Sequence, residues 1–103
     1  MENEKIFEFD ENKSQINKEK HGISFDEAKI LWQDKNALVV LAKTIGDENR
    51  YALISKLNSK CYVAIFTLRG MKYRIISVRR CRKKEEQNYE KRAKSSFNNK
   101  RVW

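Results

Sequence analysis

The chain has 103 residues, of which 36% are charged, and its formal net charge is +9. Leu, Ile, Val and Phe together number 25, which is enough for one modest packed core. The longest apolar run is the six residues 37–42 and there are only two cysteines, so the composition excludes a collagen, a membrane-spanning protein, a secreted disulfide scaffold and a structural zinc domain.

The first third of the chain predicts one short strand followed by two helices. Residues 5–9 alternate between polar and apolar side chains, as a half-buried strand does. Asp10 can cap a helix over residues 11–20, because a carboxylate at that position accepts hydrogen bonds from the first free amides. Ser24, with Glu three residues later, forms a capping-box pattern that predicts a second helix over residues 25–33.

The rest of the chain predicts four strands and a closing helix. The β-rich run at 37–42 and the alternating segments 51–57 and 72–79 each fit a strand. Residues 61–68 are apolar on both faces, which is typical of a central strand. Residues 82–96 have a helix-forming composition.

These elements predict one α+β domain over residues 1–96, followed by a frayed tail over 97–103. We expect an antiparallel sheet of four strands or slightly more, with two N-terminal helices and one C-terminal helix, and with one sheet face covered and the other open. The opening Met-Glu-Asn-Glu-Lys lacks the pattern of a signal peptide, so we expect a cytoplasmic protein. A disulfide could join Cys61 and Cys81, but a reduced pair is the simpler prediction.

The positive charge is concentrated in the second part of the chain. Residues 1–60 carry 10 positive and 11 negative side chains, whereas residues 61–103 carry 13 positive and 3 negative ones. Such a local excess attracts a polyanion, and nucleic acid is the favoured one because Lys and Arg neutralise phosphates. An acidic protein partner is the alternative.

One face of the first helix carries a candidate site. Lys13, Asn17 and Lys20 are spaced four and three residues apart, so they share a face, and His21 follows directly. These side chains could contact a phosphate backbone, or the face could simply be solvated. His21 could act as a general acid or base, because imidazole exchanges protons near neutral pH, or it could be an ordinary turn residue.

The strand at 72–80 carries two arginines. Strict alternation places Arg74 on one face with Ile76 and Val78, and Arg79 on the other face. An arginine among core residues is costly unless it is paired or partly wet, so Arg74 is either a buried ion-pair member or a residue at the edge of a cleft. Its planar guanidinium suits a phosphate and the extra negative charge of a phosphoryl transition state.

The last helix supplies a carboxylate and a phenol. Glu85 and Tyr89 lie four residues apart, on the stripe that is most able to face the sheet. A salt bridge to Arg74 or Arg79 is the simplest role for Glu85, and the alternative is a base or a group that orients an arginine. No paired acidic cluster indicates Mg²⁺, so we expect a metal-independent nuclease without a cofactor. RNA is favoured because its 2′-hydroxyl can attack the adjacent phosphate. The candidate RNA-binding residues are Lys13, Asn17, Arg69, Lys72, Arg80, Arg82, Lys83 and Lys84.

The same residues resemble the signature of the BrnT toxins. The similarity covers most of the chain between Ile6 and Glu90. Its motifs are Phe7-Glu8-Phe9-Asp10, Lys20-His21-Gly22-Ile23-Ser24-Phe25-Asp26-Glu27-Ala28, Asp47-Glu48-x-Arg50-Tyr51, Phe66-Thr67-x-Arg69-Gly70, Arg74-Ile75-Ile76-Ser77-Val78-Arg79, and Glu85 with Tyr89. The sequence departs from the family at Glu86, where Arg is usual, and at Val78 and Cys81, where Ala is usual.

The resemblance implies a toxin of a bacterial type II toxin–antitoxin pair, with a fold similar to the RelE ribonucleases. Such toxins cleave RNA and stop translation. They are neutralised by a BrnA antitoxin with a ribbon-helix-helix DNA-binding domain, through which alone the complex contacts operator DNA. Carried over by position, the catalytic candidates are Lys20, His21, Arg74, Arg79, Glu85 and Tyr89. The alternative function is a non-catalytic basic module that binds RNA or the antitoxin.

Overall fold

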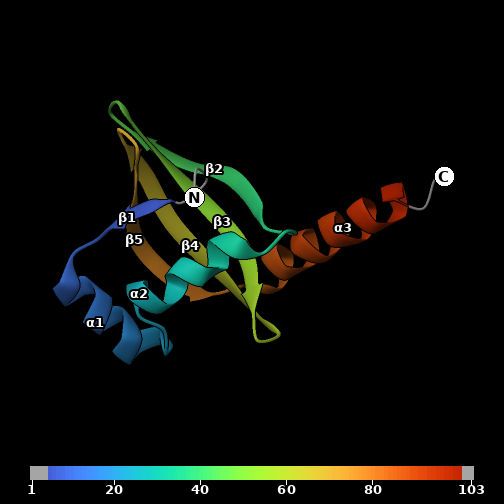
Figure 1. The fold of residues 1–103 in the computed structure, drawn as a ribbon, viewed down its shortest axis with the longest axis horizontal. Coiled ribbons are helices and arrows are strands. Elements are labelled where there is room, and N and C mark those ends of the chain that lie inside the picture. Colours follow the sequence, from blue (N-terminus) through green and yellow to red (C-terminus); the bar gives the residue numbers. More distant parts are fainter. Residues whose placement is uncertain (1–4, 101–103) are drawn as a thin grey trace.

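A computed structural model describes residues 5–100, with side chains for residues 5–94, and shows an α+β fold around a five-stranded sheet (Figure 1). The strand order is β1-β5-β4-β3-β2, so β4 is central, as its apolar sequence predicts. The strands are β1 (Ile6–Glu8), β2 (Leu38–Ile45), β3 (Glu48–Leu57), β4 (Lys60–Arg69) and β5 (Lys72–Arg80).

The prediction of a purely antiparallel sheet is wrong at one edge. Strands β2 to β5 form the expected antiparallel meander, but β1 pairs parallel with the first three residues of β5. A parallel pair needs a long crossover connection, which here consists of the N-terminal helices and the meander itself. The sheet is therefore mixed.

The helices begin where the sequence predicts. Asp10 caps α1 (Glu11–His21), and the left-handed Gly22 ends it. Ser24 and Glu27 form the predicted capping box, although the second helix is a four-residue α2 (Phe25–Ala28) continued by a 3₁₀ segment, η1 (Lys29–Gln33).

The closing helix α3 (Lys83–Lys100) extends beyond its predicted end. The tail predicted over 97–103 thus overlaps helical backbone as far as Lys100, and residues 101–103 lie outside the described residues. None of the helices in the described chain is long and apolar enough to cross a membrane.

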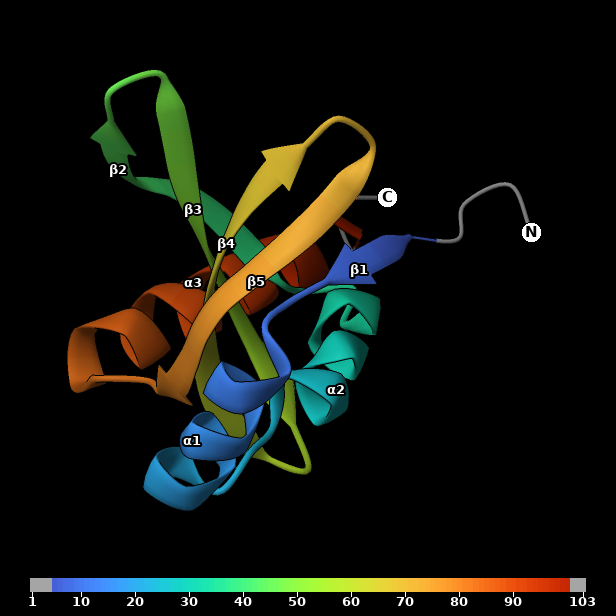
Figure 2. The same ribbon diagram turned by 90° about the vertical axis from the view of Figure 1, so that its left-hand side faces the viewer.

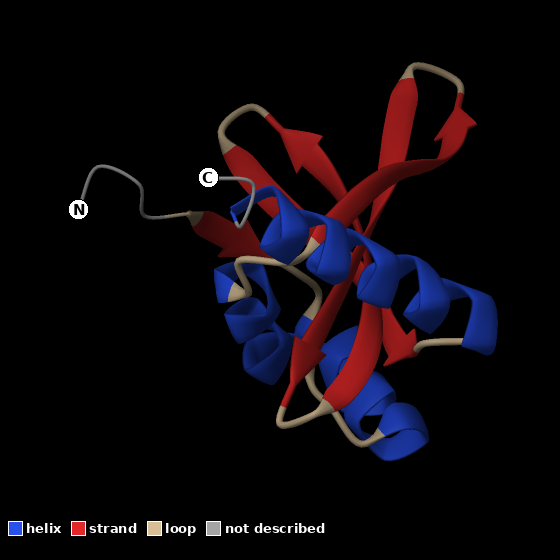
Figure 3. Cartoon of the chain, turned by 90° about the vertical axis from the view of Figure 1, so that its right-hand side faces the viewer, coloured by secondary structure: helices blue, strands red, loops and turns tan. Residues whose placement is uncertain are grey.

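Helices cover both faces of the sheet, not one. Helix α2 lies on one face of the sheet (Figure 2). There, Phe25 of α2 and Leu31 of η1 pack with Leu53, Phe66 and Val78 of the strands. On the other face α3 crosses the strands and contributes Tyr89 and Ala93 to a second, smaller core (Figure 3). The expectation of one open face therefore holds only for the part of the second face that α3 leaves uncovered.

A β-bulge in β5 breaks the alternation on which the predicted faces depended. Ile65 lies opposite Ser77 and Phe66 opposite Ile75, so Ile76 is an extra residue without a partner on β4. Beyond such a bulge every side chain moves to the opposite face. Arg79 therefore lies on the same face as Arg74, which corrects the prediction that the two arginines point to opposite sides.

The two cysteines form a disulfide, so the prediction of a reduced pair is wrong. The Cα atoms of Cys61 and Cys81 are 5.3 Å apart, and the amide of Cys81 donates a hydrogen bond to the carbonyl of Cys61 over 2.8 Å. The cysteines extend the pairing of β4 with β5 by one residue pair. The bond thus ties the start of β4 to the segment that leads into α3.

Candidate functional site

A small charged hollow of about 170 Å³ lies between the first turn of α1 and the hairpin ends of β3, β4 and β5. We call it the arginine pocket. It is lined by four cationic side chains and two acidic ones, together with Ile75 and Ile76. These charged residues are Asp10, Lys13, Glu48, Arg50, Arg69 and Arg74.

The strand register explains why the arginines meet. Arg50 lies opposite Thr67 on the neighbouring strand, and Thr67 lies opposite Arg74 on the next one. Directly opposed residues point to the same side of a sheet, and Arg69 follows Thr67 by two residues and shares that side. Three adjacent strands thus each contribute one guanidinium to the face that α3 leaves uncovered.

Carboxylates hold these arginines in place. Nε of Arg50 donates to Glu48 over 2.9 Å, and the guanidinium of Arg69 lies 3.8 Å from the same carboxylate. The Nη1 atom of Arg74 donates to Glu8 of β1 over 3.4 Å, and no second bond to Glu8 is formed. The cations still outnumber the acids, and the Arg74 side chain is 31% exposed. The pocket is therefore suited to an anion with several oxygen atoms, such as a phosphate.

Arg79 and Glu85 form a separate centre at the far end of β5. Two parallel bonds, of 2.8 and 2.7 Å, join the guanidinium to the carboxylate, which also accepts the amide of Arg82 over 2.7 Å. The hydrogen bonds from Arg79 are the main reason that the pKa of Glu85 falls to about 2, and the same contact raises the pKa of Arg79. A carboxyl group held in this way is a weak base, and its two bonds fix the orientation of the Arg79 guanidinium.

The two arginine centres do not coincide. Arg74 and Arg79 lie opposite Thr67 and Val63, which are four residues apart on β4, a separation of about 13 Å at the usual rise of a strand. The predicted catalytic residues are therefore not brought together around one atom. Arg74 and Arg79 lie on β5, Glu85 and Tyr89 on α3, and Lys20 and His21 at the end of α1.

Tyr89 serves the packing of α3. Its side chain is buried and its hydroxyl donates to Asp34 over 2.7 Å. Burial, followed by the contact with the Asp34 carboxylate, raises the pKa of Tyr89. Burial also opposes ionisation of Asp34, but hydrogen bonds from Tyr89 and from the amide of Lys56 outweigh it, so the pKa of Asp34 is lowered. This pair fastens α3 to the segment after η1.

Asn17 is not on an exposed face, which corrects the predicted grouping with Lys13 and Lys20. Its amide group donates to the carbonyls of Ile23 and Val78 over 2.8 and 2.9 Å and accepts the amide of Val78 over 3.2 Å. The side chain replaces a neighbouring strand at the edge of β5. All of its hydrogen-bonding groups are thus occupied by the fold.

Helix α1 runs along β5, which places its two ends at different centres. Lys13 lines the arginine pocket beside Arg74, and Asn17 contacts Val78 further along the strand. Lys20 and His21, both exposed, therefore lie toward the Arg79 end of β5. No ion pair involves either of them within the described chain.

The remaining predicted RNA-binding residues divide between the two faces. Lys72 is exposed and lies 3.9 Å from Glu8, next to the arginine pocket. Arg80 lies over the ring of Tyr62, on the face that α2 covers. Exposed cations begin α3 and its preceding loop: Arg82, Lys83 and Lys84.

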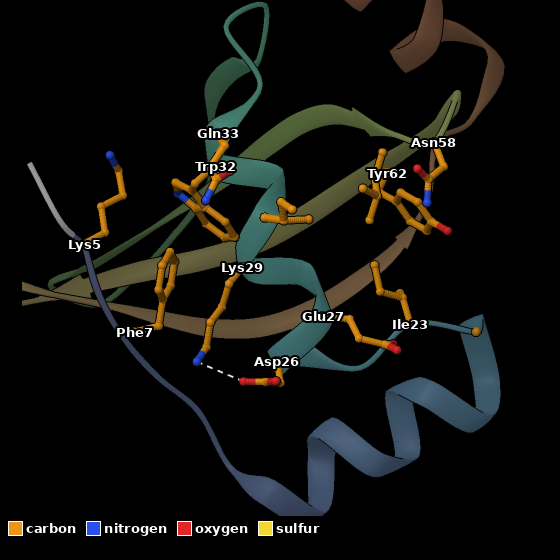
Figure 4. A pocket seen from close by; sticks show the side chains of 13 residues that line it. Lys5, Phe7, Ile23, Asp26, Glu27, Lys29, Trp32, Gln33, Asn58 and Tyr62 are labelled. Atoms are coloured by element: carbon orange, nitrogen blue, oxygen red, sulfur yellow. Dashed lines mark ion pairs between the residues drawn. The ribbon is translucent and has the colours of Figure 1, made fainter.

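A larger hollow, of about 860 Å³, lies elsewhere, beside α2 and η1 (Figure 4). Its lining carries two positive and two negative side chains, Lys5, Lys29, Asp26 and Glu27, and Lys29 forms an ion pair with Asp26. It contains none of the predicted catalytic residues. Among the described residues no three His, Cys, Asp or Glu side chains cluster as metal ligands.

Sequence reasoning missed Arg50, Glu48 and Asp34 as members of these centres. Arg50 and Glu48 precede the predicted start of their strand at residue 51, although they alternate as strand residues do. Extending the strand back to Glu48 would have placed both on one face. No pattern in the neighbouring sequence identifies Asp34, because the groups that bond to it, the amide of Lys56 and the hydroxyl of Tyr89, lie far from it along the chain.

A comparison with protein families places these residues in context. The family described as the ribonuclease toxin BrnT of type II toxin–antitoxin systems matches residues 9–85. That range includes all six charged residues of the arginine pocket and ends at Glu85. A comparison with curated proteins gave no match. Because the match covers most of the chain, the protein belongs to the BrnT family of type II toxin–antitoxin ribonuclease toxins.

Proposed function

We propose that this chain is an endoribonuclease that cleaves RNA without a metal ion, and that the arginine pocket binds a phosphate of the RNA backbone. The observation that carries the proposal is the convergence of Arg50, Arg69 and Arg74 from three adjacent strands on one hollow. A guanidinium pairs with phosphate oxygens through two parallel hydrogen bonds. With Lys13, the four cations of the pocket outnumber its two lining carboxylates and the Glu8 that binds Arg74.

The proposed reaction is an internal transfer within RNA. The 2′-oxygen bonds to the adjacent phosphorus and the bond to the 5′-oxygen breaks, which leaves a 2′,3′-cyclic phosphate and a 5′-hydroxyl. A base takes the 2′-proton and an acid delivers one to the departing 5′-oxygen. Fixed arginines stabilise the extra negative charge on the phosphorus oxygens of the transition state.

His21 is the proposed proton-transfer group, with Lys20 beside it. Both are exposed at the C-terminal end of α1, beyond Asn17, whose side chain bonds to Val78, the residue before Arg79. Glu85 then acts through Arg79 and not on the substrate. RNA would lie along β5, with one phosphate in the arginine pocket and the next contacts made by Arg79 and the cations that begin α3.

In the cell, we propose that cleavage takes place in the cytoplasm and stops translation. We also propose that a BrnA-like antitoxin neutralises it, carrying the ribbon-helix-helix domain through which the complex reaches operator DNA. The family membership supports a toxin with an antitoxin partner. The fold similarity to RelE ribonucleases is part of the same proposal.

The direct test compares Arg74→Ala, Arg50→Ala and His21→Gln with Lys60→Ala, an exposed cation at the β3–β4 turn, on a defined RNA with and without EDTA. The two arginine variants should cleave about 10²-fold more slowly, as for the loss of one transition-state donor, and Lys60→Ala should match the wild type. Cleavage that EDTA abolishes would contradict metal independence. RNA binding without any new RNA ends would favour the non-catalytic module instead.

A further inference from the structure

The outer edge of β2 is unpaired in the described chain. β2 is the last strand in the sheet order, so one side of its backbone has no neighbouring strand there. Val39, Val40 and Leu41 are 52%, 42% and 60% exposed and point alternately to both faces. A free edge with apolar side chains on both faces is a template for pairing with another extended segment.

On the opposite side the sheet ends in β1, a strand of only three residues, so it offers a much shorter edge than the eight-residue β2. β1 pairs with the first three residues of β5. Further along, the Asn17 side chain bonds to both backbone groups of Val78. The fold thus occupies the β5 edge with its own residues and leaves the β2 edge available.

Two features define what the β2 edge can accept. A bulge at Ala42, followed by Lys43, interrupts regular pairing, so the usable stretch is Leu38 to Leu41. Beside this stretch, on the face toward η1, lies an apolar hollow of about 470 Å³ whose lining includes Trp32 and Val39. A bulky apolar side chain from an added strand would enter this hollow.

The charges near the β2 edge indicate which kind of segment can bind there. Residues 35–45 carry two positive side chains, Lys35 and Lys43, and no negative one. Arg92 of α3 adds a third cation, since its Nε donates to the carbonyl of Ala37 over 3.1 Å. Two copies of this chain would bring these cations together, whereas a segment with acidic flanks would be attracted.

We propose that the β2 edge receives an extended apolar segment of the antitoxin, flanked by acidic residues, as a sixth strand. This inference rests on the proposed function, because it takes the antitoxin as the partner. None of the residues from Leu38 to Leu41 lines the arginine pocket, and the Arg79–Glu85 pair lies on β5 and α3. Strand addition therefore anchors the antitoxin independently of contacts that cover the pocket.

The test titrates a purified BrnA-like antitoxin into the wild-type toxin, a Val39→Asp/Leu41→Asp variant and an Ile16→Asp control. Ile16 is 51% exposed on α1 and lies away from β2. We expect at least a tenfold rise in Kd for the β2 variant, as for loss of an interface anchor, and about the same Kd as wild type for the control. Equal binding by the wild type and a folded β2 variant would overturn the proposal.

Hydrogen exchange on the wild-type complex gives a readout that does not depend on folding of the variant. Outward amides between Leu38 and Leu41 should exchange about tenfold or more slowly when the antitoxin is bound. Unchanged exchange there would also overturn the proposal, as would a dimer of the toxin alone that the β2 variant dissociates. RNA cleavage by the free toxin separates the two proposals: its absence contradicts the proposed function, whereas the binding data decide the docking edge.

Discussion

The ion pair between Glu85 and Arg79 should contribute measurably to stability, and Glu85→Gln tests this. The pKa of Glu85 lies at about 2 in the folded protein against 4.5 for a free side chain. A lowering of the pKa by this amount corresponds to about 3 kcal/mol. Because the Glu85 and Arg79 side chains remain 24% and 27% exposed, solvent screening lowers this value, and we expect about 2 kcal/mol.

The effect should depend on pH in a defined direction. A carboxyl group whose pKa is lowered by folding stabilises the protein above its unfolded pKa, and the stabilisation is lost as the pH falls toward the folded pKa. The difference between wild type and Glu85→Gln should thus be constant above about pH 5. It should shrink between pH 4.5 and about 2, the two values that bound the shift of Glu85.

Urea unfolding followed by circular dichroism at several pH values measures this difference. Glu86→Gln is the matched control, because Glu86 neighbours Glu85 but lies 3.8 Å from Lys56 with a side chain that is 44% exposed. Its effect should be below about 0.5 kcal/mol. If the two variants were equally stable at pH 7, or if the difference did not narrow in acid, the assignment of Glu85 to a stabilising, arginine-orienting role would be wrong.

Three further substitutions test individual contacts that stabilise the fold. Tyr89→Phe removes the hydrogen bond to Asp34 and should lower the unfolding free energy by about 1 kcal/mol in a urea titration. Asn17→Ala removes three buried hydrogen bonds and should lower it by about 3 kcal/mol, whereas Lys13→Ala, on the exposed side of the same helix, should change it little. Cys81→Ala opens a loop that joins residues 20 apart and should cost about 3 kcal/mol, and a reducing agent should lower the melting temperature of the wild type but not of the variant.

The local elements were predictable because their signals lie within a few residues. Asp10, with its side chain bonded to the amide three residues on, and the Ser24–Glu27 box both begin helices where the sequence indicates. Strand β4 is central because its side chains are apolar on both faces. The parallel pairing of β1 was not predictable, since three alternating residues fit either direction of pairing.

The contacts of the predicted site residues could not be derived from their spacing in the sequence, because their partners lie far away along the chain. The spacing of Glu85 and Tyr89 correctly places both toward the sheet, but Tyr89 meets Asp34, which lies 55 residues earlier. Helical periodicity places Asn17 on the same face as Lys13. In the structure, however, the Asn17 side chain is enclosed by the backbone of Ile23 and by Val78 at the edge of β5. Periodicity gives the direction of a side chain and leaves its neighbours undetermined.

The extra residue Ile76 in β5 determines which face of the sheet Arg79 occupies and which residue lies opposite Cys61. The hairpin pairs Arg69 with Lys72, and a regular register continued from there would place Val78 opposite Val63 and Arg80 opposite Cys61. The bulge advances β5 by one residue, so Arg79 faces Val63 instead. Arg79 then shares its face with α3, which brings it to Glu85.

The same shift places Cys81 opposite Cys61, where the backbone hydrogen bond and the disulfide form. Before the bulge, Arg74 keeps the hairpin register and stays in line with Thr67 and Arg50. The arginine pocket and the Arg79–Glu85 pair thus share one face of the sheet only because the strand between them carries one residue more than its neighbour. A regular β5 would have separated the two centres onto opposite faces and left Cys81 without a partner.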